Sequence, residues 1–209
     1  MKGQMTFYFG VMGSAKTALA LIKRFSYVEE GKKVEFLKSE KDNRDGTNVI
    51  RSRTGMSAPV KVIRENQCIS EVIGNPRGLD IIIVDEAQFL TRAQVEELKA
   101  ISSINQVPVD AYGLKNDFRG EFFEGSEALF KLSEKLVQLE KNCSCGNIAI
   151  KNVRYNPVTG EILREGPQIV IGGNEAYMSI CYECDQTGYV KLNSNRKKVK
   201  KFKTKSEEK

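Results

Sequence analysis

The chain has 209 residues and a formal net charge of +6, from 33 Lys and Arg against 27 Asp and Glu. This length favours one well-packed α/β domain with a small appendage and argues against two full-sized domains. Because no apolar run reaches the roughly 20 residues of a membrane-spanning helix, and the first residues lack the layout of a signal peptide, we expect a cytoplasmic protein with no membrane partner.

The excess positive charge lies in residues 193–209, which hold eight basic and two acidic residues. Such a run could bind nucleic acid or anionic lipid, but Phe202 is its only aromatic residue. An isolated charge run is usually a solvated end of the chain. We therefore expect a disordered basic tail and no nucleic-acid partner.

The first half of the chain begins with an aromatic-rich strand at residues 5–9, which ends at Gly10. Apolar residues at helical spacing predict a helix over residues 16–30, with Gly31 at its C-terminus. A second strand is predicted at residues 33–37. The polar stretch 38–53 is interpreted as a loop or mobile segment.

Residues 79–84 give the strongest strand signal, a continuous apolar and β-branched run typical of a strand buried on both faces of a parallel sheet. Thr91 is expected to cap a following helix, with Gln94 in the capping-box position. Residues 107–112 predict the next strand. A polar and aromatic loop follows, and a helix is predicted over residues 126–139.

This alternation predicts a parallel sheet flanked by helices, with right-handed crossovers. Ligands in such sheets bind beyond the carboxyl ends of the strands, and Gly10, Asp85 and Gly113 each follow such an end. After residue 139 the sequence changes to cysteines and short β-like runs, with a hairpin tip at residues 156–161. We therefore divide the chain into an α/β domain (1–141), a small β-rich module (142–192) and the basic tail (193–209).

The segment after the first strand has the pattern of a phosphate-binding P-loop. It consists of Gly10, Val11, Met12, Gly13, Ser14, Ala15, Lys16 and Thr17. Backbone amides and the helix N-terminus would wrap the phosphates of a ligand, Lys16 would neutralise the β and γ oxygens, and the Thr17 hydroxyl would bind Mg²⁺. The usual pattern has glycine at the position of Ala15, where a positive φ would cost about 1–2 kcal/mol.

Three polar residues after the strand at 79–84 supply a second half of this site. Asp85 is placed as the carboxylate that reaches Mg²⁺. Glu86, beside it, is free to accept the proton of an attacking hydroxyl. Gln88 offers both a donor and an acceptor to hold a substrate or a neighbouring loop. Acidic residues can also simply cap a strand end, but the combination with a P-loop favours phosphoryl transfer.

Four of the five cysteines form two close pairs, Cys143 with Cys145 and Cys181 with Cys184. A cytosolic compartment keeps thiols reduced, and the chain contains no histidine. We therefore expect the four thiolates to bind a structural Zn²⁺. Cys68 stands alone and is interpreted as a small, partly buried apolar residue.

Together these motifs resemble the zinc-containing, P-loop type of thymidine kinase. The resemblance runs from residue 6 to residue 184. Besides the P-loop and the cysteines, it rests on residues 42–44, 52–55, 85–90, 112–126 and 168–184. It implies a RecA-like P-loop sheet with a small zinc-binding lasso domain, and a homotetramer. It also implies transfer of the γ-phosphate of ATP to the 5′-hydroxyl of thymidine or deoxyuridine.

The resemblance further implies roles for single residues. Glu86 matches the general base, while Lys16, Thr17 and Asp85 match the phosphate and magnesium ligands. The other residues matched to the nucleotide side are Asp42, Arg44 and Gln88. Those matched to the nucleoside side are Met12, Phe89, Leu114, Phe118, Phe123 and Tyr177, with the main chain of Gln168, Ile169, Val170, Ile171 and Gly172 reading the base.

Two other functions stay open at this point. A P-loop impaired at Ala15 would suit a nucleotide-binding regulator without turnover, although the complete pair of Asp85 and Glu86 argues against it. A nucleic-acid ATPase is the third interpretation, and it rests on the basic tail alone.

Overall fold

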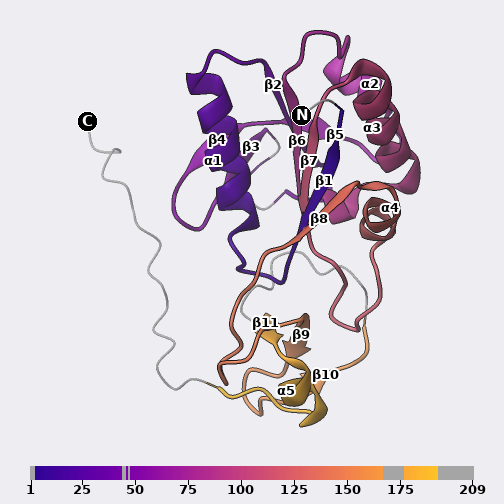
Figure 1. Cartoon of the computed structure of the whole chain (residues 1–209). Helices are drawn as coiled ribbons and strands as arrows, with labels where there is room; N and C mark the ends of the chain where they lie inside the picture. The colour runs from indigo at the N-terminus through magenta and orange to yellow at the C-terminus, as the bar shows by residue number, and fades with distance from the viewer. Residues whose placement is uncertain (1–2, 44–45, 47, 167–176, 193–209) are drawn as a thin grey trace.

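The computed structural model describes residues 3–43, 46, 48–166 and 177–192. Its largest element is a six-stranded sheet with the order β5-β2-β6-β7-β1-β8 (Figure 1). The strands are β1 (Met5–Phe9), β2 (Val34–Ser39), β5 (Lys61–Ile63), β6 (Ile81–Asp85), β7 (Val109–Gly113) and β8 (Lys135–Gln138). Every neighbouring pair in this sheet is parallel, which confirms the predicted fold class.

Helices cover both faces of the sheet (Figure 1). Helix α1 (Lys16–Glu29) packs on one face, and α2 (Ile69–Ile73), α3 (Arg92–Asn105) and α4 (Glu124–Leu132) pack on the other. Alternate residues of β6 enter the two cores: Ile81 and Ile83 join the core beneath α1, and Ile82 and Val84 join the core beneath α3 and α4. This burial on both faces explains the uninterrupted apolar run of the strand.

For three predicted strands, the predicted ends differ from the observed ends by one or two residues. The strands predicted at 33–37, 79–84 and 107–112 correspond to β2, β6 and β7. Helix α1 ends in a Schellman motif, in which Gly31 at φ 72° donates its N–H to Val28 and Lys32 donates to Tyr27. Thr91 caps α3 together with Gln94 in a complete capping box, as predicted.

The helix predicted over residues 126–139 is wrong in its second half. Helix α4 ends at Leu132, Ser133 turns into an extended conformation, and the chain then pairs with β1 as the edge strand β8. The apolar spacing of this stretch fits a helix and a strand equally well, and short runs of this kind cannot be assigned from periodicity. Pairing with β1 decides the outcome.

The interpretation of residues 38–53 as a loop is also partly wrong. Lys38 and Ser39 complete β2, and β3 (Val49–Arg51) forms an antiparallel pair with β4 (Ser57–Pro59). Lys38 is fully buried, and its Nζ donates hydrogen bonds to the carbonyl oxygens of Gly46 at 2.8 Å and Val49 at 2.9 Å. A buried lysine satisfied in this way misleads a prediction that takes charge as a sign of exposure.

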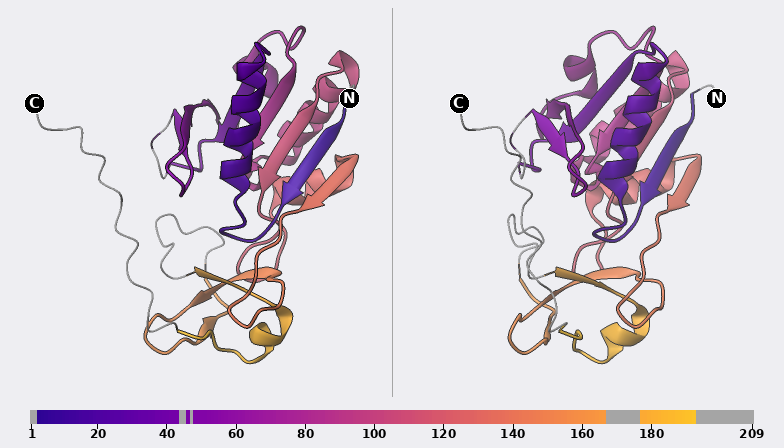
Figure 2. Two further views of the ribbon diagram at one scale, coloured as in Figure 1. Left: turned by 60° about the vertical axis from the view of Figure 1, so that its left-hand side comes forward. Right: turned by 90° about the vertical axis from the view of Figure 1, so that its left-hand side faces the viewer.

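A second group of elements, here called the cysteine module (residues 142–192), lies beyond the carboxyl ends of the large sheet (Figure 2). In its described part it contains β9 (Lys151–Tyr155), β10 (Ile162–Leu163), β11 (Tyr177–Ile180) and α5 (Tyr182–Gln186). The three strands form an antiparallel sheet with β9 in the centre. The turn at residues 156–161 joins β9 to β10, as predicted.

Among the helices of the described residues, none combines the length and apolar character that crossing a membrane would require.

Candidate functional site

The P-loop joins β1 to α1 at the edge of the sheet that faces the cysteine module (Figure 2). Gly10 lies so close to neighbouring atoms that an added Cβ would be 2.5 Å from both the Leu139 carbonyl oxygen and Ser14 Oγ. Lys16 is buried, and its Nζ donates to the carbonyl oxygens of Gly10 at 3.1 Å and Val11 at 2.8 Å. The loop therefore closes around a cation at the N-terminus of a helix, a setting that favours bound phosphate.

Ala15 adopts the left-handed conformation, with φ 64° and ψ 16°. This is the position where the usual P-loop pattern has glycine, and a Cβ in this conformation costs about 1–2 kcal/mol. Helix α1 begins directly after it, at Lys16. The departure from the motif is therefore accommodated as local strain in an otherwise regular strand–loop–helix unit.

Asp85 is the last residue of β6 and lies close to the P-loop. Its carboxylate lies close to the Thr17 hydroxyl and within electrostatic range of both Lys16 and Glu86. Burial and the charge of Glu86 raise the pKa of Asp85 to about 7, while Thr17 and Lys16 act in the opposite direction. A buried carboxylate beside a hydroxyl is an all-oxygen ligand pair of the kind that Mg²⁺ prefers, and a cation there would favour the ionised form.

The backbone conformation of Glu86 and its contact with Gln88 help to fix the position of its carboxylate. Glu86 has φ 50° and ψ 38°, between the end of β6 and the 3₁₀ helix η1 (Ala87–Phe89). Gln88 Nε2 donates to Glu86 Oε2 at 2.6 Å, and Gln88 Oε1 accepts the N–H of Leu114 at 3.0 Å. A Cβ at Gly113 would lie 2.9 Å from Gln88 Oε1, so glycine is required beside this bridge. The carboxylate is thus tied to the loop after β7.

The aromatic residues assigned to the nucleoside side lie in two groups. Phe89 and Phe123 make an edge-to-face contact, with ring centroids 5.8 Å apart. Phe118 is buried beneath the guanidinium of Arg154, which lies 5.0 Å from the ring centroid. Tyr177 is the cross-strand partner of Arg154 in the β9–β11 pair, so it lies on the cysteine module. These contacts are also what ordinary packing would give.

The remaining predicted site residues either follow the neighbouring strand or lie outside the described part of the chain. Asp42 is buried past the end of β2, with its carboxylate 4.0 Å from Lys38 Nζ. Because β2 neighbours β6, Asp42 follows the strand next to Asp85. Arg44 and the stretch Gln168–Gly172 lie outside the described residues.

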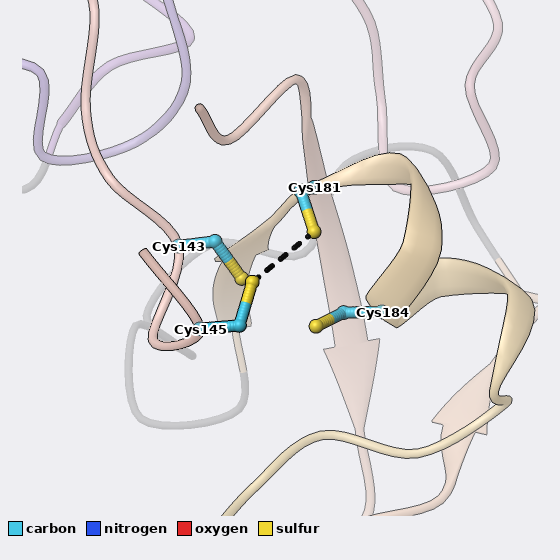
Figure 3. Close-up of side chains that lie close together, drawn as sticks. All are labelled: Cys143, Cys145, Cys181 and Cys184. Atoms are coloured by element: carbon cyan, nitrogen blue, oxygen red, sulfur yellow. Dashed lines mark hydrogen bonds between the residues drawn. The ribbon is translucent and has the colours of Figure 1, made fainter. Parts of the chain in front are cut away.

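The four paired cysteines come together in the cysteine module (Figure 3). Their Sγ atoms all lie within 4.8 Å of one another, and those of Cys145 and Cys181 are 3.4 Å apart. Tetrahedral Zn²⁺ with Zn–S bonds of about 2.3 Å requires sulfur atoms about 3.8 Å apart. The donor set and its spacing therefore fit zinc, as expected.

The short distances between the four sulfur atoms shift the pKa values of the thiols. Burial raises the pKa of Cys143, but hydrogen bonds from the backbone of Cys145 and Cys181 outweigh it and bring the value to about 6. Contacts with the other three sulfur atoms raise the pKa of Cys184 to about 12. Four thiols this close together therefore favour replacement of their protons by a metal ion. Cys68 is exposed at the start of α2, so its interpretation as a partly buried residue is wrong.

Three residues that the sequence did not single out contact the P-loop. Asn152 of β9, Ser179 of β11 and Lys141 all bond to the peptide groups of Met12. One signal was present: Asn152 is a polar residue within a β-like run, at a position that turns out to be buried. Its partner could not be found from the sequence, because Met12 lies 140 residues away.

Comparison with known proteins places the chain in a family. The thymidine kinase family model matches residues 3–185. Thymidine kinases of Escherichia coli strain K12 and Salmonella typhimurium strain LT2 are each 39% identical to it over 181 residues, which cover 85% of this chain and 88% of theirs. The Pif1 helicase of Candida albicans overlaps 66% of this chain and 36% of its own, at 14% identity and a TM-score of 0.37, a likeness that supports no conclusion. By its sequence match along most of its length, the chain belongs to the thymidine kinase family.

Proposed function

We propose that the protein transfers the γ-phosphate of ATP to the 5′-hydroxyl of thymidine or deoxyuridine, giving the nucleoside monophosphate and ADP in pyrimidine deoxynucleotide salvage. The observation that carries this proposal is the position of Asp85, which lies close to the Thr17 hydroxyl of the P-loop and beside Glu86. A phosphate-binding loop, a metal-binding carboxylate and a second carboxylate at one sheet edge are what phosphoryl transfer requires.

In this mechanism the P-loop amides and Lys16 hold the triphosphate. Thr17 and Asp85 would bind Mg²⁺, which neutralises charge on the β and γ oxygens. Glu86 accepts the proton of the 5′-hydroxyl as its oxygen bonds to the γ-phosphorus, and the bond from that phosphorus to the ADP oxygen breaks. The bridge from Glu86 through Gln88 to the Leu114 amide orients the base.

On the nucleoside side we propose that apolar and aromatic side chains form the walls of the site. These residues are Met12, Phe89, Leu114, Phe118, Phe123 and Tyr177. Main-chain groups of residues 168–172 would read the base, and Asp42 and Arg44 would lie near the phosphates. This assignment is supported by family membership and by the position of the β7–α4 loop, whose Leu114 amide bonds to Gln88.

The Zn²⁺ proposed for the cysteine module has a structural role. Four thiolate ligands complete a tetrahedral site and leave no open position for substrate. The ligands come from the turn at Cys143 and Cys145 and from the start of α5, so zinc would tie the two ends of the module together.

The proposed division of the chain is an α/β domain (1–141), the cysteine module (142–192) and a basic tail (193–209).

We further propose a cytoplasmic homotetramer. Helix α1 supports self-association because it presents a row of apolar side chains to solvent, one at every third residue. These are Leu19, Ile22, Phe25 and Val28, which are 38–62% exposed in the single chain. A row of this kind on a helix commonly marks an interface.

The reaction is tested with zinc-loaded protein, MgATP and either thymidine or deoxyuridine, by measuring the nucleoside monophosphate and ADP formed. We expect Glu86→Gln to lower kcat by about 10²–10⁴-fold, because it removes the general base. It should leave MgATP binding near that of the parent. The control variant, Glu121→Gln, changes an exposed acid on the β7–α4 loop and should keep full activity.

The parent protein decides the proposal. If it forms no monophosphate from either nucleoside, the proposed function is wrong. Full activity in Glu86→Gln would instead remove Glu86 from the role of base.

A further inference from the structure

The peptide groups of Met12, in the first half of the P-loop, are bonded to the cysteine module. The Met12 N–H donates to Asn152 Oδ1 at 2.7 Å, and the Met12 carbonyl oxygen accepts from Ser179 Oγ at 2.9 Å. Lys141 Nζ also donates to this oxygen at 2.9 Å, and it lies 3.2 Å from Ser179 Oγ. Both the donor and the acceptor of Met12 are therefore satisfied by side chains from outside the P-loop.

The two side chains that the module contributes are themselves well fixed. Asn152 and Ser179 are buried, at 4% and 5% exposure, and they face each other across the β9–β11 pair. Ser179 Oγ is 3.2 Å from Asn152 Oδ1. Neither group can turn to water without breaking this arrangement, so the pair holds the Met12 peptide in one orientation.

The residue before Met12 is anchored to the same module by apolar contact. Val11 is buried and packs in the apolar core of the cysteine module, with Val153 of β9, Ile180 of β11 and Cys181 among its members. The second half of the P-loop has different anchors: Lys16 and Thr17 begin α1, and Thr17 lies close to Asp85 at the end of β6. The loop is thus held at one end by the cysteine module and at the other by the large sheet.

We propose that Asn152 and Ser179 are positioning residues for the triphosphate, which act by fixing the Met12 peptide so that the P-loop keeps its phosphate-binding shape. The inference rests on the proposed function, in which this loop binds ATP. Its consequence is that a rearrangement of β9 and β11 changes the affinity for nucleotide. By reciprocity, bound MgATP slows hydrogen exchange in β9 and β11.

Two variants each remove a contact to Met12, and a third variant keeps the hydroxyl at position 179. Asn152→Leu keeps a similar volume but leaves the Met12 N–H without its acceptor, and Ser179→Ala removes a donor to the Met12 carbonyl. Ser179→Thr keeps the hydroxyl. The control is Arg164→Met, which breaks the ion pair with Asp185 in the same module without touching Met12.

The measurements are the Kd for MgATP in the absence of nucleoside, hydrogen exchange in peptides that cover residues 10–17, and zinc content. We expect Asn152→Leu to weaken MgATP binding by about tenfold, because a loop that has lost its fixed shape must be ordered again when the triphosphate binds. Ser179→Ala should act in the same direction but more weakly, since Lys141 Nζ still donates to the Met12 carbonyl oxygen. Exchange at residues 10–17 should speed up in both variants. Ser179→Thr and Arg164→Met should keep the parent's affinity and exchange, and all variants should keep their zinc.

The inference is wrong if Asn152→Leu leaves exchange at residues 10–17 unchanged, or if Arg164→Met weakens MgATP binding as much as Asn152→Leu does. The exchange readout separates this failure from that of the proposed function. A parent protein that does not bind MgATP contradicts the proposed function, while faster exchange in Asn152→Leu would still establish the contact that holds the loop.

Discussion

At the scale of single residues, two of the strained backbone conformations lie in the proposed nucleotide site. Of the three non-glycine residues with positive φ in the described part of the chain, Ala15 and Glu86 belong to the site, and Gln106 ends α3. Such conformations persist only where the surroundings enforce them. At Glu86 the enforcing contact is the short hydrogen bond from Gln88. At Ala15 it is the turn from the P-loop into α1.

The strain at Ala15 predicts a stabilising substitution. Ala15→Gly should raise the free energy of unfolding by up to about 1 kcal/mol, because relief of the left-handed strain outweighs the extra freedom of glycine in the unfolded chain. In a chain of this size that corresponds to a rise in Tm of about 2–4 °C, measured by calorimetry. Phosphorylation of thymidine should continue in both proteins.

The matched control is Ala20→Gly, which places the same substitution in the regular part of α1, at a fully buried residue. It should lower the free energy of unfolding by about 1 kcal/mol or more. A parent protein that is inactive and gains activity only as Ala15→Gly would favour the nucleotide-binding regulator over the kinase.

Candidate site residues could be predicted from the sequence where a motif fixes their local geometry. Lys16 and Thr17 follow a strand and open a helix, so their direction is set by neighbours in the chain. The partners Asn152 and Ser179 were not readable, because nothing near them in sequence indicates Met12. Long-range hydrogen bonds depend on how two separate sheets are placed, and that is settled only in the folded chain.

At the scale of elements, local signals with a specific mechanism gave correct results. The capping box of Thr91 and Gln94 marked the start of α3. The failure at residues 133–139 has the opposite cause, because β8 is a short edge strand with exposed Lys135 and Leu136 and little intrinsic signal. It is a strand because β1 offers an open edge for pairing.

The cysteine module should depend on its metal. Strand β10 has only two residues and the apolar core is small, so the module lacks the buried area to stay folded by itself. Removal of zinc with a chelator should therefore speed hydrogen exchange throughout β9 and β11, while β1 and β6 keep their protection. Cys145→Ser should have the same effect and lose bound zinc, measured by metal analysis.

Cys68→Ser is the control for this prediction, since Cys68 is exposed and separate from the four clustered sulfur atoms. It should retain zinc and the parent's exchange pattern. Unchanged protection of β9 and β11 after complete removal of zinc would show that the module is stable without metal.

At the scale of the whole molecule, the exposed apolar face of α1 is the feature that a single chain leaves unexplained. Phe25 is 62% exposed although it lies on a helix that packs against the sheet. If this face is an interface between copies, Phe25→Glu places a charge in it and should dissociate the oligomer. Light scattering coupled to size-exclusion chromatography measures the change in mass.

Ile104→Glu serves as the control, because Ile104 is 78% exposed on α3, away from α1. It should leave the mass of the oligomer unchanged. A parent protein that is monomeric at micromolar concentration contradicts the proposed homotetramer, and an unchanged mass in Phe25→Glu assigns the interface to another surface.

The sequence by itself determined the parallel α/β fold class, a P-loop pattern, an acidic strand end and two cysteine pairs with the donor atoms that a zinc site needs. These follow from local periodicity and from motifs whose geometry is set within a few residues. The tertiary structure decided that Thr17 meets Asp85 across the intervening strand β7, that residues 135–138 pair as a strand, and that Met12 is held by the cysteine module. The physical reason is that strand order and the contacts between two sheets depend on packing between distant segments, which no local pattern encodes.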